Sequence, residues 1–183
     1  SSHDPNLQNI PIRTTLGRNI RAAFIPNHGT SMLSADYSQV ELRILAHLSG
    51  DEGLIEAFLN QVDIHRSTAA EVLNIPASEV TPEQRGKAKA VNFGIIYGQT
   101  PFGLAKQLGI SRAEAELFID RYFNRYPRVR DYIEKVLSEA RDTGMTRTMF
   151  GRIRQISEIN SRNAMLRSMA ERMAINAPIQ GSA

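Results

Sequence analysis

The sequence has 183 residues, of which 42% are hydrophobic and 22% are charged, and its formal net charge is +3. A chain of this length and composition can bury a core as one domain or as two small ones. It contains no cysteine, which excludes disulfides and thiolate zinc sites. No apolar run approaches the ~20 residues of a membrane span, and we expect no signal peptide in the first residues.

The first predicted elements are strands. From Asn19 to Ile25 apolar and polar residues alternate, with Ile20 and Phe24 on the same face. A turn cluster follows at residues 26–29, and Ser31 to Tyr37 has the pattern of a second strand. The sequence therefore predicts a β-hairpin before residue 38.

Beyond this segment the apolar period becomes helical, and residues that typically cap helices mark most of the boundaries. Thr81 with Gln84 and Ser111 with Glu114 form capping boxes, and Gly50 and Gly98 are typical of helix ends. The predicted helices are Val40–Gly50, Glu52–Leu59, Asp63–Leu73, Thr81–Tyr97, Ser111–Tyr126, Arg128–Arg141 and Ser161–Asn176.

Charge is unevenly distributed near the end of the chain. Between Arg141 and Arg172 there are seven arginines and three acidic residues. An arginine-rich surface suits contacts with phosphates, although a solvated helix face gives the same pattern. Charge alone does not decide between these interpretations.

The segment 36–43, Asp-Tyr-Ser-Gln-Val-Glu-Leu-Arg, stands where the predicted strand ends and the next helix begins. A carboxylate such as Asp36 at this point suits a magnesium ligand. Alternatively, Ser38 and Glu41 form a capping box and Asp36 is an ordinary loop acid.

A second segment carries cations and aromatic rings on one predicted helix. Arg85, Lys89, Phe93 and Tyr97 are four residues apart, so they share one stripe. Such a stripe could hold a triphosphate with its cations and offer a ring to a nucleobase. A stripe of this mixed kind is less usual than an apolar or a charged one, because a single stripe cannot face both core and water.

Together these segments resemble the motifs of family A DNA polymerases. Residues 36–43 resemble the family's first polymerase motif, and Arg-x3-Lys-x3-Phe-x3-Tyr-Gly at 85–98 resembles its second. Residues 4–11, 63–65 and 172–181 are also similar to stretches of the family, in the same order. The resemblance implies a mostly helical α+β fold, in which a helical fingers subdomain is inserted in a partial antiparallel palm sheet of a right-hand polymerase.

The resemblance also implies roles for individual residues. Asp36, with the Tyr37 carbonyl, would hold two Mg²⁺ ions in the complete enzyme, and Glu41 with Tyr97 would crowd the 2′ position of the incoming dNTP. The fingers helix would rotate to close on a correct base pair. The residues implied in nucleotide binding are Gln39, Glu41, His65, Arg85, Lys89, Phe93 and Tyr97. Those implied in contacts with primer–template DNA are Asn6, Asn9, Arg172, Asn176 and Gln180.

The implied organisation is a partial palm over residues 1–41, fingers over 42–162 and the start of a return to the palm over 163–183. The implied protein is a monomer without membrane association, in the cytoplasm of a bacterial-type cell and associated with its nucleoid. The family's His-Asp-Glu motif, which supplies the second metal-binding aspartate, does not follow residue 181. We therefore expect a fragment that is inactive alone.

Two other functions remain open from the residues alone. Residues 104–115 resemble a helix-turn-helix, which predicts a DNA-binding module without catalysis. A single-subunit RNA polymerase shares much of the family's architecture, but Glu41 beside Phe93 favours deoxynucleotide selection.

Overall fold

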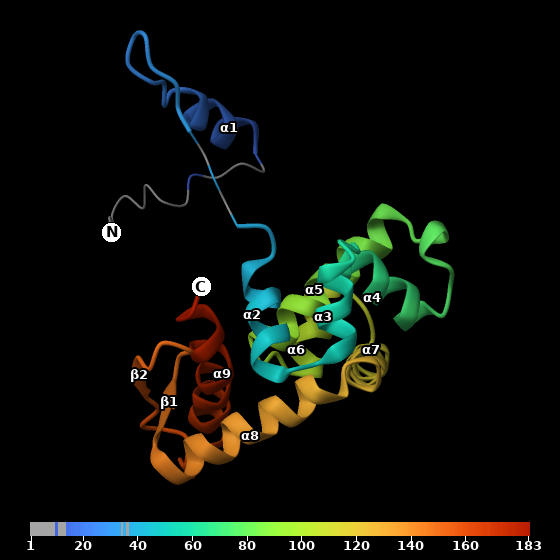
Figure 1. Ribbon diagram of the computed structural model, residues 1–183, viewed down its shortest axis with the longest axis vertical. Helices are drawn as coiled ribbons and strands as arrows, with labels where there is room; N and C mark the ends of the chain where they lie inside the picture. Colours follow the sequence, from blue (N-terminus) through green and yellow to red (C-terminus); the bar gives the residue numbers. More distant parts are fainter. Residues whose placement is uncertain (1–9, 11–13, 34, 36) are drawn as a thin grey trace. The chain divides into compact units, whose positions relative to one another are not determined.

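The structure is a computed structural model that describes residues 10, 14–33, 35 and 37–183. Its contacts divide the chain into two compact units, Ser1–Ser38 and Gln39–Ala183, which we describe separately (Figure 1). Asn6, Asn9 and Asp36 lie outside the described residues. The predicted limits of palm and fingers stay a prediction.

In the first unit the predicted strand at Asn19–Ile25 is wrong. Residues Thr15–Ala22 form helix α1, whose N-cap Thr14 accepts a hydrogen bond from the Gly17 amide at 3.0 Å. The alternation is short, and Leu16 and Ile20 are also one helical turn apart. The apolar residues therefore fit the two-residue period of a strand and the 3.6-residue period of a helix. The capping hydroxyl satisfies a free amide of the first turn and favours the helix.

The predicted turn is confirmed, but the second strand is wrong. The Thr30 amide donates to the Asn27 carbonyl at 3.0 Å, and Gly29 has a φ of +79°. Among the described residues of 31–37 there is no strand. A strand needs a partner for its backbone hydrogen bonds, and the described part of this unit offers α1 and turns instead.

The second unit is mostly helical, and the helix caps explain most of its boundaries. Asp51, Asp63, Thr81, Thr100 and Ser111 each accept a backbone hydrogen bond at a helix N-terminus. The elements are α2 (Val40–Ser49), α3 (Glu52–Leu59), α4 (Ile64–Leu73), the 3₁₀ helix η1 (Ala77–Glu79), α5 (Pro82–Ile96), α6 (Pro101–Leu108), α7 (Arg112–Arg125), α8 (Pro127–Thr143), β1 (Met145–Arg147), β2 (Ile153–Gln155) and α9 (Ala164–Gln180).

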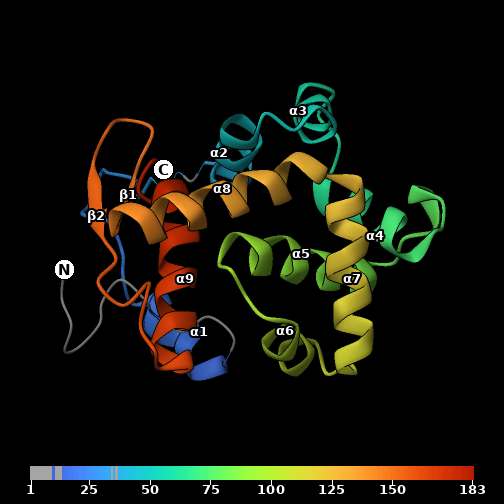
Figure 2. The same cartoon turned by 90° about the horizontal axis from the view of Figure 1, so that it is seen from below.

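Helix α5 lies between α7 and α9, and the long helix α8 runs across the ends of both (Figure 2). The main core gathers around α5 and contains Val91, Ile95 and Ile96 from that helix. Residues contributed by the other helices include Leu42, Leu45, Leu54, Ile64, Leu104, Tyr122, Tyr126 and Val129. One face of α5 is thereby fixed in the core, and the opposite face is left for other contacts.

The only sheet in the described residues is a two-stranded antiparallel hairpin, β1–β2, in which Thr146 pairs with Arg154. No strand is predicted here from the sequence. The hairpin follows α8, and a second, smaller core of Ala140, Ile156, Ile159, Ala170 and Ala174 joins α8 to α9. The predicted fold class, α+β and predominantly helical, is confirmed, although the predicted strands are not where the structure has them.

Helix α9 differs from its prediction at both ends. It begins after Asn163, whose side chain accepts from the Met165 and Leu166 amides, and it continues past Asn176 to Gln180. Pro178 stands inside its last turn. Ala177, Pro178 and Ile179 are buried, so packing of the last turn offsets the lost backbone hydrogen bond.

The helix-turn-helix pattern corresponds to a real local structure. Helix α6 ends at Gly109 with a φ of +66°, Ser111 caps α7, and the two helices pack together. Both helices also contribute to the main core, through Leu104 and Ala115 among others.

In the part of the chain that the structure describes, no helix is long and apolar enough to cross a membrane.

Candidate functional site

Helix α5 carries the predicted stripe beside its buried face, and Phe93 of the stripe also packs against the main core. Thr81 and Gln84 form the predicted capping box, and Pro82 occupies the first turn. Ala88, Val91 and Ile95 are buried, whereas Lys89 and Tyr97 are exposed and Arg85 and Phe93 are intermediate. The four residues of the stripe are therefore all at least partly accessible to solvent.

Side chains of the stripe contact one another from Lys89 to Tyr97. The Lys89 ammonium lies 5.9 Å from the Phe93 ring centroid, within the range of a cation–π contact. The Phe93 and Tyr97 rings are 6.2 Å apart with planes at 20°, so they stack along the helix. This arrangement offers positive charge at one end and a flat aromatic surface at the other.

Glu41 on α2 joins the aromatic end of the stripe. The Tyr97 hydroxyl donates a 3.0 Å hydrogen bond to Glu41 Oε2, across 56 positions of sequence. Burial, together with this bond and the carboxylate charge, raises the pKa of Tyr97 above its usual value. The Ser38–Glu41 capping box is wrong, because the N-cap of α2 is Gln39, which has a φ of +54°.

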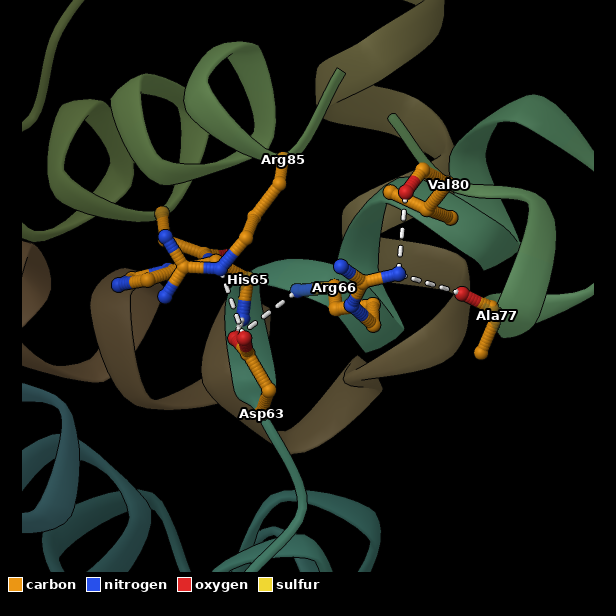
Figure 3. Close-up of polar contacts among 7 residues, drawn as sticks. Asp63, His65, Arg66, Ala77, Val80 and Arg85 are labelled. Atoms are coloured by element: carbon orange, nitrogen blue, oxygen red, sulfur yellow. Dashed lines mark hydrogen bonds and ion pairs between the residues drawn. The ribbon is translucent and has the colours of Figure 1, made fainter. Parts of the chain in front are cut away.

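Asp63 and Arg85 form an ion pair at the cationic end (Figure 3). Arg85 Nε lies 2.7 Å from Asp63 Oδ2, while Asp63 Oδ1 accepts from the His65 and Arg66 amides at the start of α4. Burial raises the pKa of Asp63, whereas the hydrogen bonds from Arg85 and Arg66 and the nearby positive charges lower it by a larger amount. The pKa of this carboxyl group therefore lies below its usual value. The carboxylate thus caps α4 and also holds the first cation of the stripe.

His65 lies beside the stripe and is 3% exposed. Its ring centroid is 6.0 Å from that of Phe93. Burial and the charges of Arg85 and Lys89 lower its pKa to about 4, against the opposing effect of Asp63. The imidazole is therefore neutral near pH 7.

Asn92 is a polar residue of this region that the sequence analysis missed. It stands on the buried side of α5, where its amide Nδ2 lies 2.9 Å from His65 Nδ1 and its Oδ1 accepts from the Thr68 hydroxyl at 3.2 Å. Asn92 directly precedes Phe93 in the sequence, but the four-residue spacing of the stripe does not include it.

The predicted DNA-binding residues of the last helix lie on α9, which packs against α5. Arg172 and Gln180 are exposed, and Asn176 is half-buried with its Nδ2 lacking a hydrogen-bond partner among the described residues. Gln39 Oε1 is likewise buried without a partner in the described part of the chain. Unpaired buried polar atoms are costly, and a bound ligand is one way of satisfying them.

Gly98 fixes the distance between the stripe and α9. It has a φ of +60°, and a Cβ placed there would lie 2.9 Å from Ile175 Cδ1 and 3.2 Å from the Arg172 Cα. Only glycine accommodates both the left-handed backbone and this close approach.

Substitution of Gly98 by alanine should therefore destabilise the chain by about 2–4 kcal/mol, the sum of backbone strain and overpacking. Gly109→Ala is the matched control, because Gly109 has a similar φ of +66° but open space around its Cα. The control should cost only about 1–2 kcal/mol. Urea unfolding of the two variants measures the difference, and equal losses would mean that contact with α9 is unimportant.

The arginine-rich segment forms an exposed, largely unpaired set of cations. Arg141 pairs with Glu171 at 2.9 Å. Within the described residues no ion pair involves the exposed arginines Arg147, Arg152, Arg154, Arg162 and Arg172. Unpaired guanidinium groups of this kind suit phosphate oxygens.

The first-motif residues are only partly described. Tyr37 belongs to the first unit and is 79% exposed. Among the described residues there is no cluster of three or more metal-ligating side chains.

Comparison with known proteins identifies the family of this chain. The model of the family described as DNA polymerase family A matches residues 1–183. The chain belongs to DNA polymerase family A. It is 56% identical over 183 residues to DNA polymerase I of Pseudomonas aeruginosa and 55% identical to that of Caldicellulosiruptor bescii, matching all of this chain in both cases. It spans only 20% and 22% of the length of those relatives.

A solved structure is also similar. It is the POL domain of Pol1 from M. smegmatis in complex with DNA primer-template and dNTP, with a TM-score of 0.91 and 51% sequence identity. The similarity covers all of this chain and 32% of that chain. The family assignment accounts for the two polymerase motifs and for the overall helical fold.

Proposed function

We propose that this chain forms the site for the incoming nucleotide, and part of the template surface, of a DNA-directed DNA polymerase of the DNA polymerase I type. The observation that carries the proposal is the stripe on α5, in which Asp63 pairs with Arg85 at the cationic end and Glu41 accepts from Tyr97 at the aromatic end. The similar M. smegmatis domain was solved with DNA primer-template and dNTP. A helix-turn-helix module without catalysis explains none of the stripe.

In this proposal Arg85 and Lys89 bind the triphosphate of the dNTP, and His65 contacts it from the side. Phe93 packs on the sugar and base. Charge-assisted hydrogen bonds to phosphate are stronger than neutral ones, and bases stack on aromatic rings. Along α5 the cations precede the aromatic rings, as the triphosphate precedes the sugar and base in the nucleotide.

Membership of this family implies the use of divalent metal ions. The proposed ligands, the Asp36 carboxylate and the Tyr37 carbonyl, are oxygen donors of the kind that Mg²⁺ prefers. Two donors do not complete a site for two ions, so further ligands come from outside this pair. When bound, the ions stabilise the charge that develops as the primer 3′-hydroxyl attacks the nucleotide and pyrophosphate leaves.

For primer–template DNA, the proposal uses Arg172, Asn176 and Gln180 on α9, with Asn6 and Asn9 from the first unit. The exposed arginines near the hairpin supply further phosphate contacts. The orphaned Asn176 Nδ2 would gain an acceptor from the nucleic acid, which is consistent with a site completed by its ligand.

Glu41→Ala tests the assignment of sugar selection. In the complete polymerase that contains this chain, we expect the preference for deoxy- over ribonucleotides to fall roughly tenfold to a hundredfold, because removing the carboxylate leaves room for the 2′-hydroxyl. The α2 cap does not use Glu41, so the stability loss should stay below about 1 kcal/mol.

The matched control is Glu52→Ala, which removes an exposed first-turn glutamate from the neighbouring helix α3. Incorporation efficiencies for dNTP and rNTP on one primer–template give the ratio for each variant. An unchanged ratio in Glu41→Ala would refute the role in sugar selection.

A further inference from the structure

Three buried polar side chains connect α4 to α5 behind the stripe. Thr68, Asn92 and His65 are 1%, 0% and 3% exposed. The Thr68 hydroxyl donates to Asn92 Oδ1 at 3.2 Å, and Asn92 Nδ2 lies 2.9 Å from His65 Nδ1. Buried polar groups of this kind hold one arrangement, because breaking a bond leaves an unsatisfied group.

The hydrogen bond between Asn92 and His65 determines which nitrogen of the neutral His65 ring carries the proton. In the orientation that the Asn92 amide has in the structure, its nitrogen donates to His65 Nδ1, and the neutral imidazole then carries its proton on Nε2. A charged ring would place an N–H on Nδ1 against the N–H of Asn92. Asp63, Arg85 and Lys89 are the charged groups that act on the ring, and the two cations also oppose a positive charge there.

The remaining nitrogen is available for another partner. Among the described residues no hydrogen bond is made by His65 Nε2, and the ring lies beside Phe93 on the stripe. A fixed N–H donor next to Arg85 and Lys89 is suited to a phosphate oxygen, and it adds no third positive charge to the unliganded site.

We infer that Asn92 is a positioning residue of the nucleotide site: oriented by Thr68, it holds His65 as the neutral Nε2–H tautomer, which donates to the triphosphate of the incoming nucleotide. The donation to phosphate rests on the proposed function. The tautomer of His65 does not rest on the proposed function, so an experiment can refute the tautomer and the donation to phosphate separately.

Nitrogen-15 NMR of the chain labelled at its four histidines tests the tautomer directly. His65→Gln assigns the His65 signals by their loss. We expect a neutral ring with the proton on Nε2, and no titration of this ring between pH 6 and 8. A proton on Nδ1, as a flipped Asn92 amide would produce, overturns the inference while leaving the proposed function intact.

Asn92→Asp changes the donor to an acceptor with almost no change of shape. We expect its carboxylate to draw the proton to Nδ1 and to raise the pKa of His65, because the negative charge favours the imidazolium. Asn124→Asp is the control, since it adds the same charge at an exposed position of α7. The control should leave the His65 signals unchanged.

In the complete polymerase the inference predicts a pH-dependent defect. Above the raised pKa, Asn92→Asp presents a lone pair on Nε2, and the dNTP KM should rise about tenfold relative to Asn124→Asp. Below that pKa the imidazolium again has a proton on Nε2, and the ratio of KM values should return toward one. The ratio of the dNTP KM of Asn92→Asp to that of Asn124→Asp removes pH effects that both variants share, such as ionisation of the nucleotide and of other groups.

A ratio that stays constant from pH 6 to 8 would overturn the link between Asn92 and the nucleotide, because a general packing defect has no such pH profile. If Arg85→Ala then still raises the dNTP KM, the proposed function stands without His65. Thermal melting establishes that Asn92→Asp is folded at the assay temperature. If it does not fold, the tautomer of the unsubstituted chain decides the inference alone.

Discussion

Asp36→Asn in the complete polymerase should reduce nucleotide addition by about a thousandfold or more, while primer–template affinity changes by less than about twofold. The amide has the shape of the carboxylate but not its charge, and metal ions in such sites contribute several kcal/mol to the stabilisation of the transition state. A loss of about 4 kcal/mol corresponds to roughly a thousandfold in rate.

The control for this substitution is Asp120→Asn, which removes a carboxylate from an exposed position of α7. Single-turnover primer extension in the presence of Mg²⁺ gives the rate, and fluorescence anisotropy of a labelled primer–template gives the affinity. Extension by Asp36→Asn within tenfold of the parent would remove Asp36 from the metal site.

Arg85→Ala and Lys89→Ala should each raise the dNTP KM by roughly tenfold to a hundredfold, with little change in DNA affinity. Each substitution removes a charge-assisted contact to the triphosphate, worth about 1.5–3 kcal/mol. Loss of the half-exposed Arg85–Asp63 pair should cost only about 0–1 kcal/mol of folding stability, because solvent screens it. Asp63 keeps its hydrogen bonds to the first turn of α4.

Lys87→Ala provides the matched control for these two variants. Lys87 is on the same helix, but its ammonium pairs with Glu83 at 2.9 Å rather than lying on the stripe. Its substitution should leave the dNTP KM unchanged. If DNA affinity fell in Arg85→Ala and Lys89→Ala while KM stayed constant, the stripe would bind the DNA backbone rather than the nucleotide.

Local signals predicted the helical part of the fold well. Asp63, Thr81 and Ser111 cap the helices at which the sequence placed them, because a side-chain acceptor at an N-terminus acts within a few residues. The stripe on α5 followed from its four-residue spacing alone. These features need no information from distant parts of the chain.

The features that depend on distant parts of the chain were not predicted. The Tyr97–Glu41 bond spans 56 positions and the Arg85–Asp63 pair spans 22, and no local pattern encodes either distance. The contact of Asn92 with His65 depends on the packing of α4 against α5, which the sequence does not reveal. The strand predicted at Asn19–Ile25 failed because a seven-residue alternation is compatible with a capped helix.

The most direct test of the central claim is a crystal structure of the complete polymerase with a dideoxy-terminated primer, its template and the matching dNTP. We expect triphosphate oxygens within hydrogen-bond distance of the Arg85 and Lys89 side chains, with the base or sugar against the Phe93 ring. A triphosphate bound away from α5, with the stripe facing only the DNA backbone, would contradict the central claim.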